Sequence, residues 1–376
     1  MGRDLSRVSV VGTGSCLPNA PIPNSKIDDV LGRLTDAPKR VRVFSEGFGP
    51  SYLESSGIRH RHFAIDPATG RITHTCADMA EDASRRALEQ AGRKATDVDL
   101  LLLATPYYDH IVPPTSSVLQ ERLGIERCVE MEIHSNCAGV GKCMQIAFDA
   151  LRLGRYKTAL VTYVQHSSSF LRSCWFQQQL MTKSQAALRY ILADGAGAVV
   201  LEGGHDGRRK PVEHELLGVH VESIGGLRPA GMTAGGGVAA LLDGAGSLVG
   251  LHQAGSHHLD QDFPAVSREG RVLAAEATLR MLEALQLESA QIDHYVGSIP
   301  NNALYEQGLA KFASLLKVDR AKVKFRATDS GYCGGASILV HFDHMVRDGE
   351  LRAGETVALG AVESSKWMWG GFVVRW

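Results

Sequence analysis

The stretch AEDASRRALEQAGRKATDVD, residues Ala80–Asp99, has a counterpart in AEATLRMLEALQLESAQID, residues Ala275–Asp293. Identical residues recur at one separation of 194 positions, in the pairs Leu88/Leu282, Asp99/Asp293, Pro106/Pro300 and Phe148/Phe342. Self-similarity at a fixed separation, in segments of matching character, is typical of an internal repeat. The sequence therefore predicts that the chain consists of two related halves.

Each predicted half has the same order of elements. An early apolar strand precedes a segment with apolar residues at helical spacing, and further strands then alternate with helices. The predicted strands are 8–12, 100–104, 129–133 and 158–164 in the first half and 216–221, 294–297, 323–326 and 356–361 in the second. The predicted helices include 76–91 and 268–286, and two more that start at Cys137 and Cys333.

Strands that alternate with helices predict parallel βαβ units with right-handed crossovers. Two such halves, related by an approximate twofold axis, would bury helices between two sheets. We therefore predict an α/β fold with a duplicated, five-layered α/β/α/β/α body, whose halves are residues 1–205 and 206–376. The halves would meet in the glycine- and charge-rich segment 203–214. A second glycine-rich segment, 231–250, is either a surface insertion or a cover over a pocket.

Composition narrows the class of protein. The 376 residues have a net charge of −1 and a pI of about 6.9, which argues against nucleic-acid and anionic-membrane partners. No apolar run approaches the roughly 18 residues that span a bilayer, and no signal peptide is visible. Seven cysteines are scattered without metal-ligand spacing. These features predict a cytoplasmic protein with free thiols and no metal site.

One cysteine stands where chemistry is plausible. Cys137 lies in Ser135-Asn136-Cys137-Ala138-Gly139, between an apolar strand and a predicted helix. The start of a helix stabilises a thiolate, and its free N–H groups can bind a developing oxyanion. This placement suits covalent acyl catalysis. From these residues alone, Cys137 is either a nucleophile or a small residue of the core.

The duplicated halves and the strand–cysteine–helix junction resemble the thiolase superfamily, in particular the beta-ketoacyl-ACP synthase III enzymes. The resemblance spans nearly the whole chain and is carried by five motifs, which are 57–62 (GIRHRH), 136–139 (NCAG), 194–198 (DGAGA), 334–337 (GGAS) and 369–376 (WGGFVVRW). It implies that Cys137 accepts an acyl group from a thioester of coenzyme A or of an acyl carrier protein. It also implies that the backbone N–H groups of Cys137 and Ser365 bind the oxyanion.

Two positions depart from the family pattern. Ser298 stands where the family has a catalytic histidine, and Tyr332 stands where it has a catalytic asparagine. In the family this pair donates hydrogen bonds to the enolate formed when a malonyl unit loses its carboxylate. Loss of a preorganised donor typically costs about 100- to 1000-fold in rate. The resemblance therefore leaves Ser298 and Tyr332 as candidate catalytic residues of a modified reaction.

The resemblance also places the donor site and the acyl pocket. Tyr52, Arg59 and Asn301 would bind the thioester donor. Ser51 stands where the family has a tryptophan, which favours a carrier protein over coenzyme A as the donor. Val112 would shape the acyl pocket of a partner subunit, so we expect a homodimer. No resident cofactor is expected, because the acyl thioester is the substrate.

The group that accepts the acceptor's proton is not obvious. Glu363 stands where the family has an apolar aromatic residue, and a carboxylate beside an apolar pocket is a stronger base than one in water because desolvation destabilises its charge. Alternatively, Glu363 forms a surface ion pair with Lys366 or Arg375. If Glu363 is not the base, the next candidates are His110, His166 and His257.

We therefore expect a condensing enzyme or acyltransferase of the synthase III type. It would load an acyl group on Cys137 and pass it to a small-molecule acceptor, in a specialised biosynthetic pathway such as secondary metabolism. One alternative is a non-catalytic partner subunit of an active thiolase-fold homologue, which the altered Ser298 and Tyr332 positions favour. Another is an ordinary ketosynthase with a displaced histidine.

Overall fold

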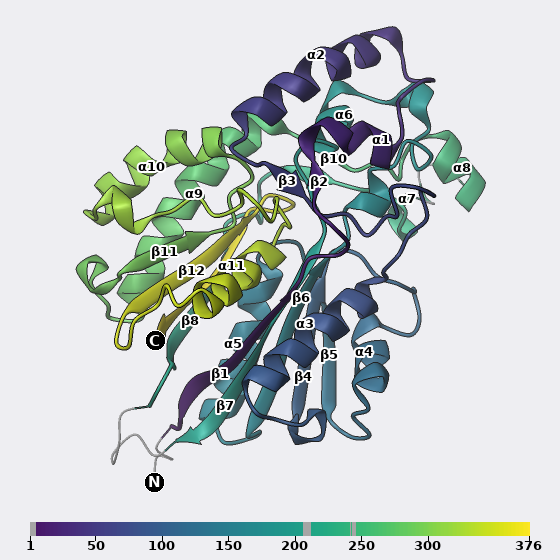
Figure 1. Cartoon of the computed structure of the whole chain (residues 1–376). Helices are drawn as coiled ribbons and strands as arrows, with labels where there is room; N and C mark the ends of the chain where they lie inside the picture. The colour runs from purple at the N-terminus through teal and green to yellow at the C-terminus, as the bar shows by residue number, and fades with distance from the viewer. Residues whose placement is uncertain (1–4, 206–211, 241, 243–245) are drawn as a thin grey trace.

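The computed structural model describes residues 5–205, 212–240, 242 and 246–376. Nine strands form one sheet, in the order β11-β12-β13-β8-β1-β7-β6-β4-β5 (Figure 1). Residue 206 at the predicted boundary, half of the connector 203–214 and part of the segment 231–250 lie outside the described residues. The boundary therefore stays a prediction.

The two ends of the sheet repeat one strand pattern. In the first half the strands are β1 (Arg7–Cys16), β7 (Gly195–His205), β6 (Thr158–Gln165), β4 (Leu100–Thr105) and β5 (Val129–His134). In the second half they are β8 (Glu215–Ser223), β13 (Met368–Arg375), β12 (Thr356–Glu363) and β11 (His294–Gly297). In both halves two antiparallel pairings are followed by a parallel one. The halves of the sheet meet where Ser9 of β1 pairs with Glu215 of β8.

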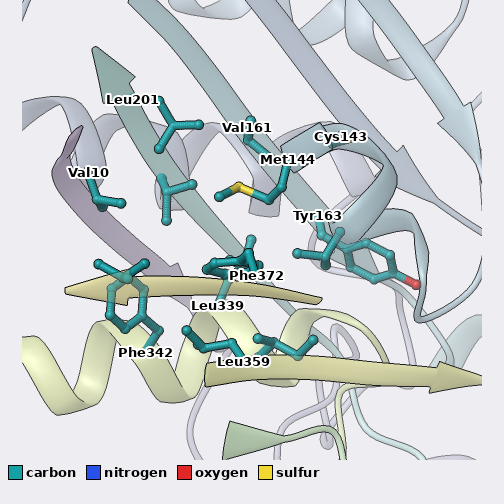
Figure 2. Packing of buried hydrophobic residues seen from close by; sticks show 14 of the residues in the cluster. Val10, Cys143, Met144, Val161, Tyr163, Leu201, Leu339, Phe342, Leu359 and Phe372 are labelled. Carbon is teal, nitrogen blue, oxygen red and sulfur yellow. The ribbon is translucent and has the colours of Figure 1, made fainter. Parts of the chain in front are cut away.

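Helices cover and separate the two halves of the sheet. The inner layer is α5 (Gly139–Arg152) and α11 (Ala336–Arg347), which contact strands of both halves. The outer layers are α3 (Cys76–Gln90) with α4 (Thr115–Leu123), and α9 (Phe263–Ala284) with α10 (Asn302–Leu316). Figure 2 shows the buried core between Met144 of α5, Leu339 of α11 and the strand residues Leu201 and Phe372. The predicted five-layered α/β fold is confirmed, although the two predicted sheets are the two ends of one continuous sheet.

Local chemistry explains the outer helix α3. Thr75 and Asp78 form a capping box at its start, which satisfies two backbone N–H groups. Small residues on its inner face let the helix lie almost against β1, where Gly12 and Gly14 leave room. A Cβ on Gly12 would lie 2.1 Å from the carbonyl oxygen of Ala87. Packing this close excludes any larger residue at position 12.

Four predicted elements differ in detail. Helix α11, predicted to start at Cys333, begins at Ala336. Helix α5 begins at Gly139 rather than at Cys137, which lies in the preceding turn. Helix α9 begins at Phe263, five residues before the predicted start, because Asp262 caps it by accepting from the N–H of Ala265. Residues 323–326 form no strand, since only Val323 bridges to Tyr295 in β11.

A smaller group of elements lies over one end of the body, at the top of Figure 1. It contains α1 (Ile27–Leu31), α2 (Lys39–Ser55), α6 (Lys183–Leu188), α7 (Val238–Ala240), α8 (Leu248–Gln253) and the short pairs β2 (Ile22–Pro23) with β3 (His60–Arg61) and β9 (Met232–Thr233) with β10 (Asp260–Gln261). No helix among the described residues is both long and apolar enough to cross a membrane.

Candidate active site

Cys137 lies where the inner helices of the two halves begin. It follows β5 by three residues and stands two residues before the start of α5. Gly335, at the start of α11, approaches it so closely that a Cβ on Gly335 would lie 2.9 Å from the Cα of Cys137. The Sγ of Cys137 lies 3.6 Å from the hydroxyl oxygen of Tyr332. The structure thus brings the predicted nucleophile and the predicted asparagine position into contact.

The thiol of Cys137 is held in its neutral form. Burial raises its pKa to about 12, and the nearby charge of Glu363 acts in the same direction. The neighbouring hydroxyls of Tyr332 and Ser298 lower the pKa but do not offset burial. The expected stabilisation of a thiolate at the helix start is therefore outweighed by desolvation. A proton must leave the sulfur before or during its attack on a thioester.

Ser298 and Tyr332 do not reproduce a histidine–asparagine pair. Ser298 follows β11, and its hydroxyl donates to the carbonyl oxygen of Gly334 at 2.5 Å. Its proton is therefore already engaged. Burial raises the pKa of Tyr332 well above the usual value, so its phenol is a neutral group that can donate or accept one hydrogen bond.

Glu363, the last residue of β12, is 5% exposed and lies behind the Cys137 turn. Its Oε2 accepts from the hydroxyl of Ser135 at 2.7 Å and from the N–H of Ala138 at 3.3 Å. Its Oε1 accepts from the hydroxyl of Ser365 at 2.6 Å. The ammonium of Lys142 donates in turn to the Ser135 hydroxyl at 2.8 Å. This chain from Lys142 through Ser135 to Glu363 was not predicted, because Glu363 lies 228 residues after Ser135 in sequence.

The surface ion pair considered for Glu363 is not formed. Arg375 pairs instead with Glu215 at 3.6 Å, and Lys366 donates to the carbonyl oxygen of Arg228 at 2.5 Å. The Glu363 carboxylate also does not belong to the cavity wall, although Val362 and Ser364 on either side do. Glu363 therefore acts on Cys137 through its charge and through its hydrogen bond with the Ala138 N–H, just before α5.

A cavity of about 680 Å³ leads from the surface to Cys137. Its mouth includes the exposed residues Ser55, Lys183 and Gln307. Neither a histidine nor a carboxylate lines it in the described part of the chain. Three aromatic rings of α2 stack along its wall, Phe44 on Phe48 at 4.8 Å and Phe48 on Tyr52 at 5.3 Å. This aromatic row was not recognised in the sequence, although its spacing of four residues is helical.

The three predicted donor-site residues separate into two places. Tyr52 and Asn301 line the cavity together, with the Asn301 amide donating to the Tyr52 hydroxyl at 3.1 Å. Asn301 also caps α10 by accepting from the N–H of Leu304. Arg59 does not line the cavity. Its exposed guanidinium instead makes a two-pronged ion pair with Asp329 at 2.9 and 2.7 Å.

The remaining predicted residues lie outside the cavity of this chain. Val112 is 82% exposed, on the loop before α4. Ser365 does not line the cavity, although its neighbour Ser364 does. His110 is exposed, whereas His166 donates to the carbonyl of His74 and His257 to that of Trp175. Within the described ranges, no three His, Cys, Asp or Glu side chains lie close enough to hold a metal ion.

Comparisons with known proteins agree with this geometry. The profile of the 3-oxoacyl-[acyl-carrier-protein] synthase III family matches residues 131–223, and the profile of its C-terminal part matches residues 282–376, together half of the chain. The chain is 27% identical over 373 residues to a beta-ketoacyl-[acyl-carrier-protein] synthase III of Methylococcus capsulatus, with 99% of this chain and 100% of that protein covered.

Solved structures show the same fold. A tetronic acid condensing enzyme matches with a TM-score of 0.78 at 24% identity, covering 98% of this chain and 100% of that one. The 3-oxoacyl-(acyl carrier protein) synthase III of Pseudomonas aeruginosa matches with a TM-score of 0.74 at 23% identity, covering 98% of each chain. The chain therefore belongs to the 3-oxoacyl-[acyl-carrier-protein] synthase III family of thiolase-like condensing enzymes.

Proposed function

We propose that this protein is an acyltransferase that takes an acyl group from a thioester onto Cys137 and passes it to a small-molecule acceptor. The observation that carries the proposal is the contact between Cys137 and Tyr332 in a cavity to whose wall the described residues contribute neither histidine nor carboxylate. A cysteine in such a place suits transthioesterification, whereas standard decarboxylative condensation needs two preorganised donors.

The loading step can be written with its protons balanced. The Cys137 sulfur attacks the thioester carbonyl, a new C–S bond forms, and the donor leaves as a free thiol. Because the Cys137 thiol is neutral, its proton passes to the Tyr332 oxygen while the phenol gives its own proton to the departing sulfur. Tyr332 ends the step as it began, and no other acid or base is required.

The transfer step reverses this relay. The acceptor's hydroxyl, amine or activated carbon attacks the acyl-Cys137 carbonyl, and its proton returns through Tyr332 to the cysteine sulfur. Ser298 contributes little as a donor, because its proton is held by the Gly334 carbonyl. Glu363 acts through its charge rather than as the proton acceptor, because it lies outside the cavity wall. The backbone N–H of Cys137 remains the proposed oxyanion donor, whereas Ser365 lies outside the cavity wall.

We further propose a carrier protein as the donor and a homodimer as the assembly. The Tyr52 ring faces Phe48, and Ser51 offers no ring for an adenine. The exposed ammonium of Lys183 at the mouth, 5.5 Å from the Phe44 ring, suits the phosphate of a carrier arm. The exposed Val112 loop and the exposed edge strand β5 suit a second copy, whose Val112 would then close the pocket. The altered Ser298 and Tyr332 positions support a specialised pathway.

Intact-mass spectrometry tests the proposal. The protein is incubated with acetyl, hexanoyl and decanoyl thioesters of a carrier protein and of coenzyme A, and the mass gain is measured. The expected result is one acyl group per chain, lost in Cys137→Ala and kept in Cys143→Ala, which removes a buried cysteine of α5. Absence of any gain would contradict the proposal. Activity of a co-purifying homologue that survives Cys137→Ala would favour the partner-subunit alternative.

A further inference from the structure

The cavity continues past Cys137 into the second half of the molecule. One face of α9 lines it at every turn from Phe263 to Met281, a length of about 27 Å at 1.5 Å per residue. The mouth at Lys183 is exposed, whereas Met281 at the other end is fully buried. The space therefore has one open end and one closed end.

The closed end, here called the lower arm, lies between α9, α10 and the strands β11 to β13 (Figure 1). Its wall consists of Thr278, Met281, Tyr295, Leu309, Phe312, Val323, Ala358 and Trp369. Tyr295 lies in β11, three residues before Ser298. At roughly 3.3 Å per residue, the arm extends about 10 Å beyond the level of Ser298 and Cys137.

Both hydroxyl groups on the wall of the lower arm already have partners. The Thr278 hydroxyl donates to the Ala274 carbonyl at 2.7 Å, and the Tyr295 hydroxyl donates to the Ser289 carbonyl at 3.2 Å. None of the wall residues of the lower arm carries a charge. Cavities of this kind stay dry and bind apolar groups. The ligand that fits is a hydrocarbon chain.

The passage between Cys137 and the lower arm is lined by small residues. Ser298 lines the cavity beside Cys137, and Gly297 pairs in register with Gly360 of β12. Both glycines belong to the cavity wall, where the Trp369 ring packs against Gly360 and the Ile299 side chain against Gly297. A carbon chain attached to the Cys137 sulfur would therefore pass Ser298 and run beside the Trp369 ring into the lower arm.

We infer that the lower arm holds the chain of the acyl group loaded on Cys137, so that the preferred donor carries an unbranched acyl group of medium to long length. The inference rests on the proposed function, since it names the substrate class of that same site. It assigns selectivity for chain length to residues of the second half, on α9 and β11.

Chain-length profiles test this inference. The rate of Cys137 loading is compared for acetyl, hexanoyl, octanoyl, decanoyl and dodecanoyl carrier-protein thioesters. Burial of each methylene should raise the specificity constant by roughly fourfold until the lower arm is full, corresponding to about 0.8 kcal/mol per methylene. A flat profile, or one that falls beyond acetyl, would overturn the inference while leaving the proposed function intact.

Two variants should shift the profile in opposite directions. Thr278→Phe fills the lower arm and should move the optimum to shorter chains, whereas Met281→Ala deepens it and should move the optimum to longer ones. Leu279→Phe is the matched control, because this residue lies on the same helix but not on the cavity wall. Circular dichroism and the thermal unfolding temperature show that each variant is folded. Profiles that stay identical to that of the wild type in both variants would overturn the inference.

A binding measurement separates failure of the inference from failure of the proposed function. If no thioester loads Cys137, the proposed function falls, and calorimetry with free decanoate then examines the lower arm directly. Binding to the wild type that is weakened at least tenfold by Thr278→Phe supports an alkyl site. Equal binding by both proteins, or no binding by either, overturns it.

Discussion

The hydroxyl oxygen of Tyr332 lies 3.6 Å from the sulfur of Cys137, and the two residues come from opposite halves of the chain. Each stands shortly before an inner helix, Cys137 before α5 and Tyr332 before α11. The contact exists because the two helices start at the same point between the halves of the sheet. It gives the neutral thiol of Cys137 a neutral partner through which a proton can move.

Removal of the Tyr332 hydroxyl should slow loading without abolishing it. General acid–base groups contribute about 100- to 10,000-fold, so Tyr332→Phe should load at least about 100-fold more slowly. Rapid-quench mass spectrometry measures the rate. Tyr305→Phe is the control, because Tyr305 also lines the cavity but donates to the Val323 carbonyl. Loading by Tyr332→Phe at the wild-type rate would exclude the relay.

The charge of Glu363 should be visible in the acidity of Cys137. Glu363 raises the pKa of the thiol, so Glu363→Gln should lower it from about 12. Alkylation by iodoacetamide, which follows the thiolate, should then reach a given rate at a lower pH. Glu350→Gln, which removes a carboxylate paired with Arg326, should leave the profile unchanged. A shift to higher pH in Glu363→Gln would show that the charge does not act this way.

Two buried histidines should make the protein sensitive to acid. Burial lowers the pKa of His341 to about 3 and that of His258 to about 4, against 6.5 in an unfolded chain. The unfolded state therefore binds more protons below pH 6.5, so stability is complete above that pH and is lost as the pH falls towards 4 and 3. Each histidine contributes at most about 1.4 kcal/mol per pH unit.

The variant His341→Gln measures how much His341 contributes to the loss of stability at acid pH. His341→Gln should lose less stability than the wild type between pH 6.5 and pH 4.5, as measured by the free energy of unfolding in denaturant. The quantity to compare is the change in the free energy of unfolding with pH, because the substitution itself lowers stability at every pH. Parallel curves for the two proteins would show that His341 does not remain neutral in the folded state.

The proposed homodimer can be broken at the exposed edge. β5 is the last strand of the sheet, and its Met131 is 39% exposed. Unpaired edge strands with apolar side chains invite pairing with a second chain. Met131→Lys with Val112→Asp should convert the dimer to a monomer in light scattering. Leu153→Asp, at another exposed apolar residue, should leave the dimer unchanged. A wild-type protein that is monomeric at micromolar concentration would contradict the proposal.

The fold was predictable because its signal is local and repeated. The helical spacing of α3 and the buried strand β4 are each visible in a short window, and the 194-residue separation places their counterparts in the second half. The position of Cys137 between β5 and α5 follows from the same pattern. The prediction of a strand at residues 323–326 was wrong. Only Val323 forms a bridge, and the sequence pattern does not distinguish a single bridge from a strand.

The surroundings of Cys137 were harder to predict because they depend on contacts between distant segments. The hydrogen bonds of Glu363 come from the turns at Ser135 and Ser365, and only the folded chain brings these turns together. Desolvation of the thiol is likewise a property of the packed core. Arg59 is a further example, because its partner Asp329 lies 270 residues away and could not be anticipated from the local motif.

The most direct measurement is the mass of the intact protein after incubation with a decanoyl carrier-protein thioester. The expected result is a gain of one decanoyl group, absent in Cys137→Ala and present in Cys143→Ala. Hydroxylamine, which cleaves thioesters, should remove the gain. An unchanged mass with every donor tested, or a gain that persists in Cys137→Ala, would contradict the assignment of Cys137 as the acyl-carrying residue.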